Sequence, residues 1–293
     1  MQHTSNFCDF LTHQKRYSAN TITAYKNDLE QFQFFLAHQY QIGKTNDVTS
    51  SIIRSWIVQL IEEEISPRSI TRKISTLKSF YKYLLKTKVV TTNPLLKVIS
   101  PKTATRLPVY VTEKEMSTLF DKTEFDNDFE GCRNQLMLEL FYATGIRLSE
   151  LIGIHNSSID FNNNTLKVLG KRNKERIIPV GNQLKKLVLN YIKLREYNRF
   201  KSDFFFLTKK GEKMYPKLVY RIVNHYLSTV TTLSKKSPHI LRHTFATHML
   251  NNGAELNSIK EILGHANLSA TQVYTHNTIE KLKNIHKQAH PKG

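Results

Sequence analysis

Four stretches of the sequence carry side chains that packing alone does not require. Arg147 lies just after Gly145 in Ala-Thr-Gly-Ile-Arg-Leu-Ser-Glu-Leu (143–151), and Glu150 follows three residues later. His239 and Arg242 are three residues apart at the start of a predicted helix, so they share one of its faces. A Lys-rich turn and a C-terminal run supply the remaining candidates, which are Lys171, Lys174, His265 and Tyr274.

Each stretch also has an ordinary structural explanation. A Gly-x-Arg sequence can end a helix, His239 and His243 can form a surface pair, and Tyr274 can be a half-buried aromatic residue. A zinc site at the two histidines is disfavoured because position 240 is Ile, where a His-Glu-x-x-His site has Glu. We therefore predict no metal site and no cofactor.

Together, the candidates suit phosphoryl transfer on a nucleic-acid backbone. Two guanidiniums can bind a phosphodiester through paired hydrogen bonds and stabilise the charge of a five-coordinate phosphorus. A tyrosine hydroxyl is a weak nucleophile in water, but arginines and a histidine beside it can activate it. A lysine on a hairpin turn can protonate the departing 5′ oxygen. Because a phosphotyrosine bond conserves the energy of the broken backbone, rejoining needs no high-energy cofactor.

This set of residues resembles the tyrosine recombinase family, and within it the Xer subgroup of bacterial site-specific recombinases. The resemblance is carried by residues 143–151, by Val-Leu-Gly-Lys-Arg-Asn-Lys-Glu-Arg-Ile-Ile-Pro-Val at 168–180 and by 239–276. It spans nearly all of the chain, and it is strongest from 134 to 276 and looser before 100. It implies that Arg147 and Arg242 clamp the phosphate and that Lys171 is the general acid. It further implies that His239 and His265 exchange protons with the nucleophile, which is Tyr274. It also implies that Glu150 orients this set, and that His243 and His248 are structural. Spacing alone does not separate Lys171 from Lys174.

Charge points to the same class of partner. The chain has 43 Lys and Arg against 24 Asp and Glu, a net charge of +19 with a pI near 9.8. Such a field attracts polyanions, and the excess is spread along the chain instead of forming one tail. Charge therefore predicts a nucleic-acid partner, although a Lys-rich protein with an alkaline pI would have the same composition, and the resemblance implies that this partner is double-stranded DNA.

The predicted fold is mainly α with a small antiparallel β-sheet, in two domains. Residues 1–98 form an N-terminal helical domain, which the resemblance identifies as a SAM-like core-binding bundle, with helix starts at Ser18, Thr49 and Ser66-Pro67. Residues 99–108 have a linker composition. Residues 109–293 form the catalytic domain, with a Thr112/Glu115 capping box, a hairpin over 165–180, helices near 183–199, 216–232 and 239–251, and a tail helix.

Basic residues follow the outer face of the third long helix of the N-terminal domain. They are Arg68, Arg72, Lys73, Lys78, Lys82 and Lys86. Such a face is often only solvated, but it can equally lie along a phosphate backbone. The candidates for DNA binding are Arg68, Arg72 and Lys73, together with Arg172 in the hairpin turn.

The resemblance implies a C-shaped clamp around DNA, with four protomers on two duplexes and a Holliday junction between two rounds of strand exchange. A second, related recombinase and a DNA translocase activator are further implied partners, and the implied role is resolution of chromosome dimers at a dif-type site. Residues 277–290, with Ile279, Leu282, Ile285 and Ala289 at helical spacing, either dock on a neighbouring protomer, which we expect, or fold back on their own domain.

Three other functions remain open. An integrase of a mobile element shares the chemistry but usually has an extra arm-binding domain, for which we find no room before residue 15. A type IB topoisomerase relaxes DNA by itself, and a simple DNA-binding protein forms no covalent adduct. The N-terminus lacks a signal-peptide pattern, no apolar run approaches the length of a membrane span, and the two cysteines form no disulfide framework, so we expect a cytoplasmic protein.

Overall fold

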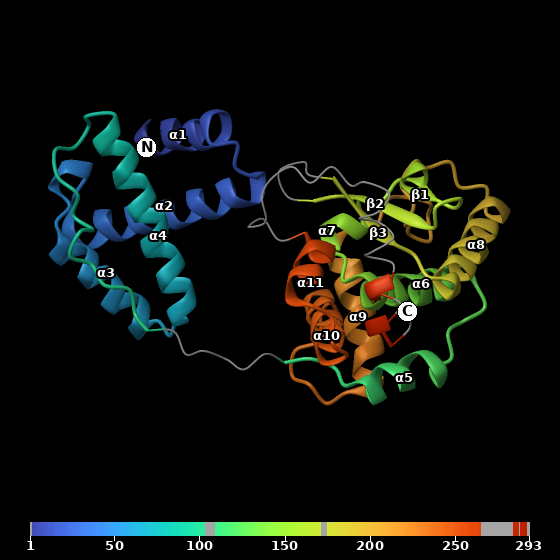
Figure 1. The fold of residues 1–293 in the computed structure, drawn as a ribbon. Helices are drawn as coiled ribbons and strands as arrows, with labels where there is room; N and C mark the ends of the chain where they lie inside the picture. The colour runs from blue at the N-terminus through green and yellow to red at the C-terminus, as the bar shows by residue number, and fades with distance from the viewer. Residues whose placement is uncertain (1, 103–108, 171–174, 265–283, 287, 292–293) are drawn as a thin grey trace. The chain divides into compact units, whose positions relative to one another are not determined.

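The computed structural model describes residues 2–102, 109–170, 175–264, 284–286 and 288–291. Four predicted site residues, Lys171, Arg172, His265 and Tyr274, lie outside these described residues, as does Lys174. The chain divides into two units, Met1–Arg106 and Leu107–Gly293, each with its own hydrophobic core (Figure 1).

Helices build the N-terminal unit: α1 (Gln2–Asp9), α2 (Ala19–Tyr40), α3 (Ser50–Glu62) and α4 (Pro67–Lys86). The three predicted helix starts are confirmed, because the side-chain oxygens of Ser18, Thr49 and Ser66 accept hydrogen bonds from first-turn backbone N–H groups. The apolar faces of these helices meet around Phe32, Trp56, Ile74 and Leu77, which are all buried.

Lys73 corrects the predicted basic face of α4. Its side chain is buried, donates a 3.2 Å hydrogen bond to Asp28 Oδ1 and also binds Gln31. The other oxygen of Asp28 accepts from Arg72 and, at 2.9 Å, from Thr76. Lys73 is not on the outer face because it sits next to the buried stripe of α4, so it cannot make the exposed DNA contact that we expected.

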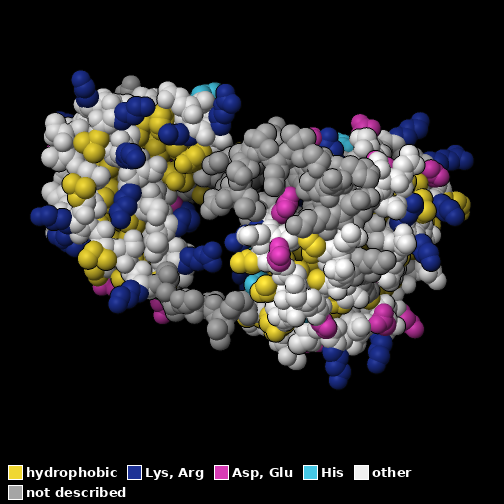
Figure 2. All heavy atoms as spheres, viewed as in Figure 1, with side chains coloured by type: hydrophobic (Ala, Val, Ile, Leu, Met, Phe, Trp, Pro, Cys, Tyr) yellow, Lys and Arg dark blue, Asp and Glu magenta, His cyan; other side chains and the backbone are white. Residues whose placement is uncertain are grey.

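The other members of the basic face point outward. Arg68, Arg72, Lys78, Lys82 and Lys86 are exposed. Figure 2 shows Lys and Arg side chains spread over the visible face of the N-terminal unit. This surface therefore keeps a strong positive charge without Lys73.

The C-terminal unit contains a three-stranded sheet among helices. Its helices are α5 (Glu113–Asp121), α6 (Phe129–Thr144), α7 (Leu148–Leu151), α8 (Asn182–Tyr197), α9 (Pro216–Val230), α10 (Pro238–Asn251) and α11 (Leu256–Leu263). The Thr112/Glu115 capping box at α5 is confirmed. The buried helix α6 contacts α8 and α10, and α10 also contacts α9 and α11, so α6 lies at the centre of the core (Figure 1). Among the described residues, none of the helices has the length and hydrophobicity of a membrane span.

The predicted hairpin forms the larger part of the sheet. The strands β1 (Ile159–Asp160), β2 (Thr165–Leu169) and β3 (Glu175–Pro179) pair antiparallel in the order β1-β2-β3. On β3, Arg176 and Ile178 are both buried, since alternate residues of a strand face the same side. Arg176 pairs in register with Val168 of β2, which is also buried.

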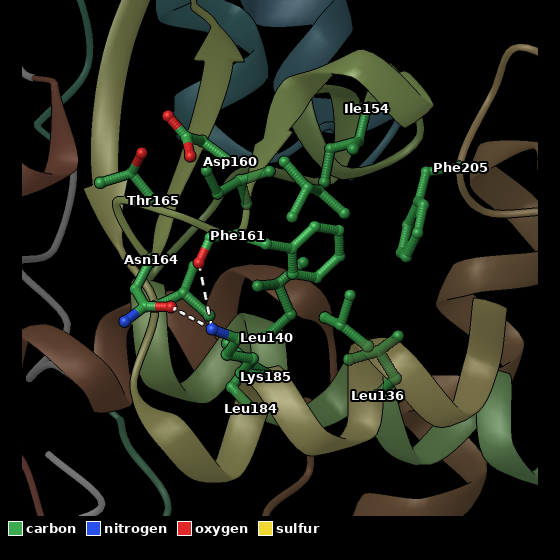
Figure 3. A pocket seen from close by; sticks show the side chains of 14 residues that line it. Leu136, Leu140, Ile154, Asp160, Phe161, Asn164, Thr165, Leu184, Lys185 and Phe205 are labelled. Carbon is green, nitrogen blue, oxygen red and sulfur yellow. Dashed lines mark hydrogen bonds between the residues drawn. The ribbon is translucent and has the colours of Figure 1, made fainter.

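A small cavity between the sheet and α6 belongs to the core. Leu136 and Leu140 line it from α6, and Lys185 of α8 donates hydrogen bonds at its edge to Phe161 O and Asn164 Oδ1 (Figure 3). Its volume is about 20 Å³, close to that of one water molecule. It is therefore a packing gap and holds no substrate.

The Asp28 network predicts a specific stability change. Asp28→Asn would leave Lys73 buried without a negative partner, so the N-terminal unit should lose about 3–5 kcal/mol of unfolding free energy. Urea denaturation of the full chain, followed by fluorescence, measures this unit selectively because the single tryptophan, Trp56, lies in its core.

Two variants serve as controls for this experiment. Glu30→Gln removes a carboxylate from the same helix, but its ion pair with Lys26 is exposed and should contribute less than about 1 kcal/mol. Adding Lys73→Met to Asp28→Asn should recover part of the loss. If Asp28→Asn cost no more than Glu30→Gln, the buried network would not be stabilising.

Candidate active site

Arg147 is positioned by the turn between α6 and α7. Gly145 ends α6 with a φ of +59°, and a Cβ there would lie 2.6 Å from side-chain atoms of Phe245 and Leu263. Glycine is thus required both for the left-handed conformation and for the close approach. The chain then passes through buried Ile146 and places Arg147 at the N-terminus of α7.

Glu150 holds the backbone and the side chain of Arg147 together. Its Oε2 accepts from Arg147 N at 2.8 Å, and its Oε1 accepts from Arg147 Nη1 at 2.7 Å. The resemblance implied that Glu150 orients the site residues, and this geometry is suited to that role. The Arg147 side chain keeps 32% of its surface exposed, so part of the guanidinium faces solvent.

Arg242 and His239 come from the first two turns of α10. Arg242 is buried and donates to Gly145 O at 2.6 Å and to Leu263 O at 2.8 Å. His239 is exposed on the same helix. Although the residue as a whole is exposed, partial desolvation of the imidazole, followed by the positive charge of Arg242, lowers the pKa of His239, which favours the neutral ring that can accept a proton.

Arg176 of β3 is a member of this cluster that the sequence analysis missed. It donates from Nη1 and Nη2 to the two oxygens of Glu150, at 2.7 and 2.8 Å, and from Nε to Ile262 O at 2.9 Å. A charged residue on the buried side of a strand was the signal that could have revealed it, because buried charges are nearly always paired.

Three arginines converge on the end of α11. The consecutive carbonyls of Ile262, Leu263 and Gly264 accept from Arg176, Arg242 and Arg147, the last at 3.2 Å. The last carbonyls of a helix lack intrahelical partners and carry the negative end of its dipole. The end of α11 therefore gathers side chains from three other parts of the chain.

The cluster carries an excess of positive charge. Three guanidiniums surround one carboxylate, which leaves a formal charge of +2. Burial alone would raise the pKa of Glu150, but the hydrogen bonds and charge of Arg176, aided by Arg147, lower it to about 2. Burial and the charges of Arg147 and Arg176 lower the pKa of Arg242, which nevertheless stays protonated near neutral pH. An anion bound here would relieve this repulsion.

The other signature histidines differ in environment. His248 is buried and its Nδ1 lies 3.0 Å from the hydroxyl of Tyr142, which fits the structural role implied for it. His243 is partly exposed. Among the described residues, no group of three or more His, Cys, Asp or Glu side chains could hold a metal ion.

The described part of the C-terminal tail packs on its own domain. His286 Nε2 lies 2.6 Å from Ala143 O, His290 Nε2 lies 3.0 Å from Tyr142 O, and Ala289 joins a cluster with Phe245. Of the two arrangements that we considered, this is folding back. Residues 284–286 and 288–291 therefore pack on their own domain in this single chain, and the expected docking on a neighbouring protomer stays a prediction.

Sequence comparisons place the chain among known proteins. Residues 110–281 match the sequence profile of the Phage integrase family, and residues 5–88 match that of the phage integrase N-terminal SAM-like domain. The chain is 38% identical to a tyrosine recombinase XerC of Chlorobaculum tepidum, over 97% of this chain and 94% of the relative. It is 40% identical to a tyrosine recombinase XerC of Anoxybacillus flavithermus, over 98% and 97% of the two chains.

Solved structures show the same fold. XerH site-specific recombinase bound to a palindromic difH substrate matches with a TM-score of 0.73 and 19% identity, over 97% of this chain and 82% of that one. The Tn1549 transposon integrase in complex with circular intermediate DNA matches with a TM-score of 0.71 and 20% identity, over 95% and 98%. From the matched profiles and the XerC relatives, this chain belongs to the phage integrase family and is a tyrosine recombinase of the Xer group.

Proposed function

We propose that this protein cleaves and rejoins double-stranded DNA at a dif-type chromosomal site and so resolves chromosome dimers. The observation that carries the proposal is the pair Arg147 and Arg242, which are held at the same helix end with His239 on the helix of Arg242. Two fixed guanidiniums beside a neutral imidazole suit a phosphodiester that gains negative charge during the reaction.

The arginine pair is preorganised to bind a phosphate. Contacts with the described residues use two of the five N–H donors of each side chain. The remaining donors can bind non-bridging phosphate oxygens. The backbone carbonyls and Glu150 meanwhile hold the two guanidinium groups in place. Because folding already fixes the positions of the two guanidiniums, they need little reorganisation when charge develops on the phosphate.

The proposed reaction proceeds by two transesterifications. The Tyr274 oxygen attacks phosphorus and its proton passes to a histidine, for which His239 and His265 are the candidates. The bond from phosphorus to the 5′ oxygen breaks, and Lys171 protonates that oxygen. The products are a 3′-phosphotyrosine and a free 5′ hydroxyl. Attack by the 5′ hydroxyl of a second duplex reverses these steps and forms the Holliday junction.

Several observations support DNA as the partner. The exposed face of α4 carries Arg68 and Arg72, and the chain as a whole has a net charge of +19. XerH and the transposon integrase, which share the fold, were solved with DNA bound. We propose that Arg68, Arg72 and Arg172 contact the DNA backbone. We also propose that four protomers assemble on two sites in the cytoplasm, with a related recombinase and a DNA translocase as further partners.

Integration of a mobile element is the second candidate function, since one structure with this fold is a transposon integrase. The chemistry would be the same and the target would differ. Footprinting the protein on its own chromosome would identify the bound site and decide between the two. A topoisomerase would instead relax supercoiled plasmid without a specific site.

Tyr274→Phe should abolish covalent capture of DNA. A duplex with the footprinted site, nicked beside the cleavage position, traps the cleaved intermediate because the short 5′ fragment diffuses away. We expect the wild-type protein to form a 3′-linked adduct in the presence of a chelator and Tyr274→Phe to form none, while both bind DNA equally. Tyr197→Phe, which alters an exposed tyrosine of the same unit, is the matched control. Adduct formation by Tyr274→Phe would refute the assignment of the nucleophile.

Arg147→Ala and Arg242→Ala should slow cleavage more than they weaken binding. Each removes donors aimed at the developing charge, so we expect a loss of about 2–4 kcal/mol in transition-state stabilisation. Single-turnover adduct formation measures this loss. Arg221→Ala removes an equal charge from an exposed site in the same unit and should cleave normally. Undiminished cleavage by Arg147→Ala or Arg242→Ala would contradict the clamp.

Deletion of residues 277–293 should weaken recombination but spare DNA binding. The deletion removes the contacts of His286 and His290 with the end of α6 and uncovers Phe245. If the tail also joins protomers, recombination between two sites should fall further than adduct formation on one site. Recombination at the wild-type rate would show that the tail is not exchanged between protomers.

A further inference from the structure

Arg176 joins three elements of the active site. Its backbone belongs to β3, its two Nη groups bind Glu150 of α7, and its Nε binds Ile262 O of α11. The side chain is 5% exposed. In sequence, β3 follows the turn that contains Lys171, and Ile262 precedes His265 by three residues. Arg176 is therefore the side chain through which the hairpin and the end of α11 both contact Glu150.

Packing does not explain an arginine at this position. The residues beside it on the buried side of the sheet, Ile178 and Val168, are apolar. A buried ion pair is often no more stabilising than an apolar group of similar volume. The reason for an arginine at position 176 must therefore lie in how its hydrogen bonds position its partners, Glu150 and the end of α11.

The geometry of Glu150 depends on Arg176. Each carboxylate oxygen accepts one hydrogen bond from Arg147 and one from Arg176, at 2.7 Å on Oε1 and 2.8 Å on Oε2. Arg176 binds both oxygens of the carboxylate through its two Nη groups, a paired contact that the single ammonium group of a lysine could not reproduce. If this paired contact were absent, Glu150 could rotate and carry the Arg147 side chain with it.

Gly264 shows how closely Arg176 fits the end of α11. Gly264 has a φ of +64°, and a Cβ at this position would lie 3.0 Å from Arg176 Cδ and 3.4 Å from its Nε. The guanidinium thus lies directly against the turn whose carbonyl binds Arg147. A shift of Arg176 would be transmitted to that turn as well as to Glu150.

We propose that Arg176 is a positioning residue of the recombination reaction. It fixes Glu150, and through it Arg147, and it ties the hairpin to the end of α11 without itself contacting the DNA phosphate. This inference rests on the proposed function.

The first test compares Arg176→Lys with a matched control. Arg133 is likewise a buried arginine of this unit that binds a glutamate, Glu130, and a backbone carbonyl, Leu207 O, but it takes no part in the cluster. We expect Arg176→Lys to bind the nicked duplex within about twofold of wild type, but to form the adduct roughly 10–100-fold more slowly, as when partners that orient a functional group are lost. Folded Arg133→Lys should cleave at the wild-type rate.

The second test is the pH dependence of adduct formation between pH 4.5 and 8. The charged groups that face Glu150 among the described residues are Arg147, Arg176 and Arg242. In the wild type Glu150 stays ionised throughout this range. In Arg176→Gln the pKa of Glu150 should rise, because the ionised carboxylate loses the hydrogen bonds and charge of Arg176. Cleavage by this variant should therefore decline at mildly acidic pH, where Glu150 of the wild type stays ionised. Glu150→Gln added to Arg176→Gln removes the titrating group and should abolish that extra decline.

The outcomes separate this inference from the proposed function. If the wild-type protein forms no adduct on the footprinted site, the proposed function fails. If it does, and Arg176→Lys cleaves at the wild-type rate, the positioning role is refuted. It is also refuted if Arg133→Lys is impaired to the same degree, or if Arg176→Gln and its double variant both keep the wild-type pH profile.

Discussion

The end of α11 is the constraint on which the candidate active site depends. Ile262, Leu263 and Gly264 present three successive carbonyls, and each accepts a hydrogen bond from a different arginine. Guanidiniums repel one another, so a group of three needs compensation inside the protein. It comes from this helix end, from Gly145 O at the end of α6 and from the carboxylate of Glu150. The site can therefore form before any DNA is bound.

This compensation is incomplete, and in the proposed mechanism the imbalance would favour the transition state. Burial and the neighbouring arginines make the charge of Arg242 less stable here than in water and so lower its pKa. A phosphodiester relieves part of that destabilisation, and a five-coordinate phosphorus with an additional negative charge relieves more. Interactions that strengthen between the ground state and the transition state are those that accelerate a reaction. A second carboxylate would lower the formal charge of the cluster from +2 to +1, so the site would bind both states more weakly and this difference would shrink.

The sequence predicted elements with local signals and missed contacts that depend on tertiary structure. Ser66 before Pro67 marks the start of α4 because a capping hydroxyl and a proline act within one turn. Arg147 and Glu150 could be paired from their spacing of three residues. Arg176, in contrast, acquires its role from Glu150 and Ile262, which are far away in the chain. Lys73 was placed on the wrong side of α4 because its partner Asp28 lies on another helix, although its spacing from Ile70 and Leu77 pointed inward.

Arg176 and Lys73 also show how the charge of this chain should be interpreted. Each is buried and bound to a carboxylate inside its own unit, so neither side chain belongs to the exposed positive surface. The exposed positive charge of α4 comes instead from residues such as Arg68, Lys78 and Lys82, which contribute to the net charge of +19. The attraction between exposed cations and DNA weakens as salt rises, because salt screens charges over distance and because each phosphate contact releases counterions. The buried cations act at fixed short distances that salt hardly screens. In the proposed mechanism, a rise in ionic strength should therefore weaken DNA binding through the exposed cations more than it slows the chemical step at the buried cluster.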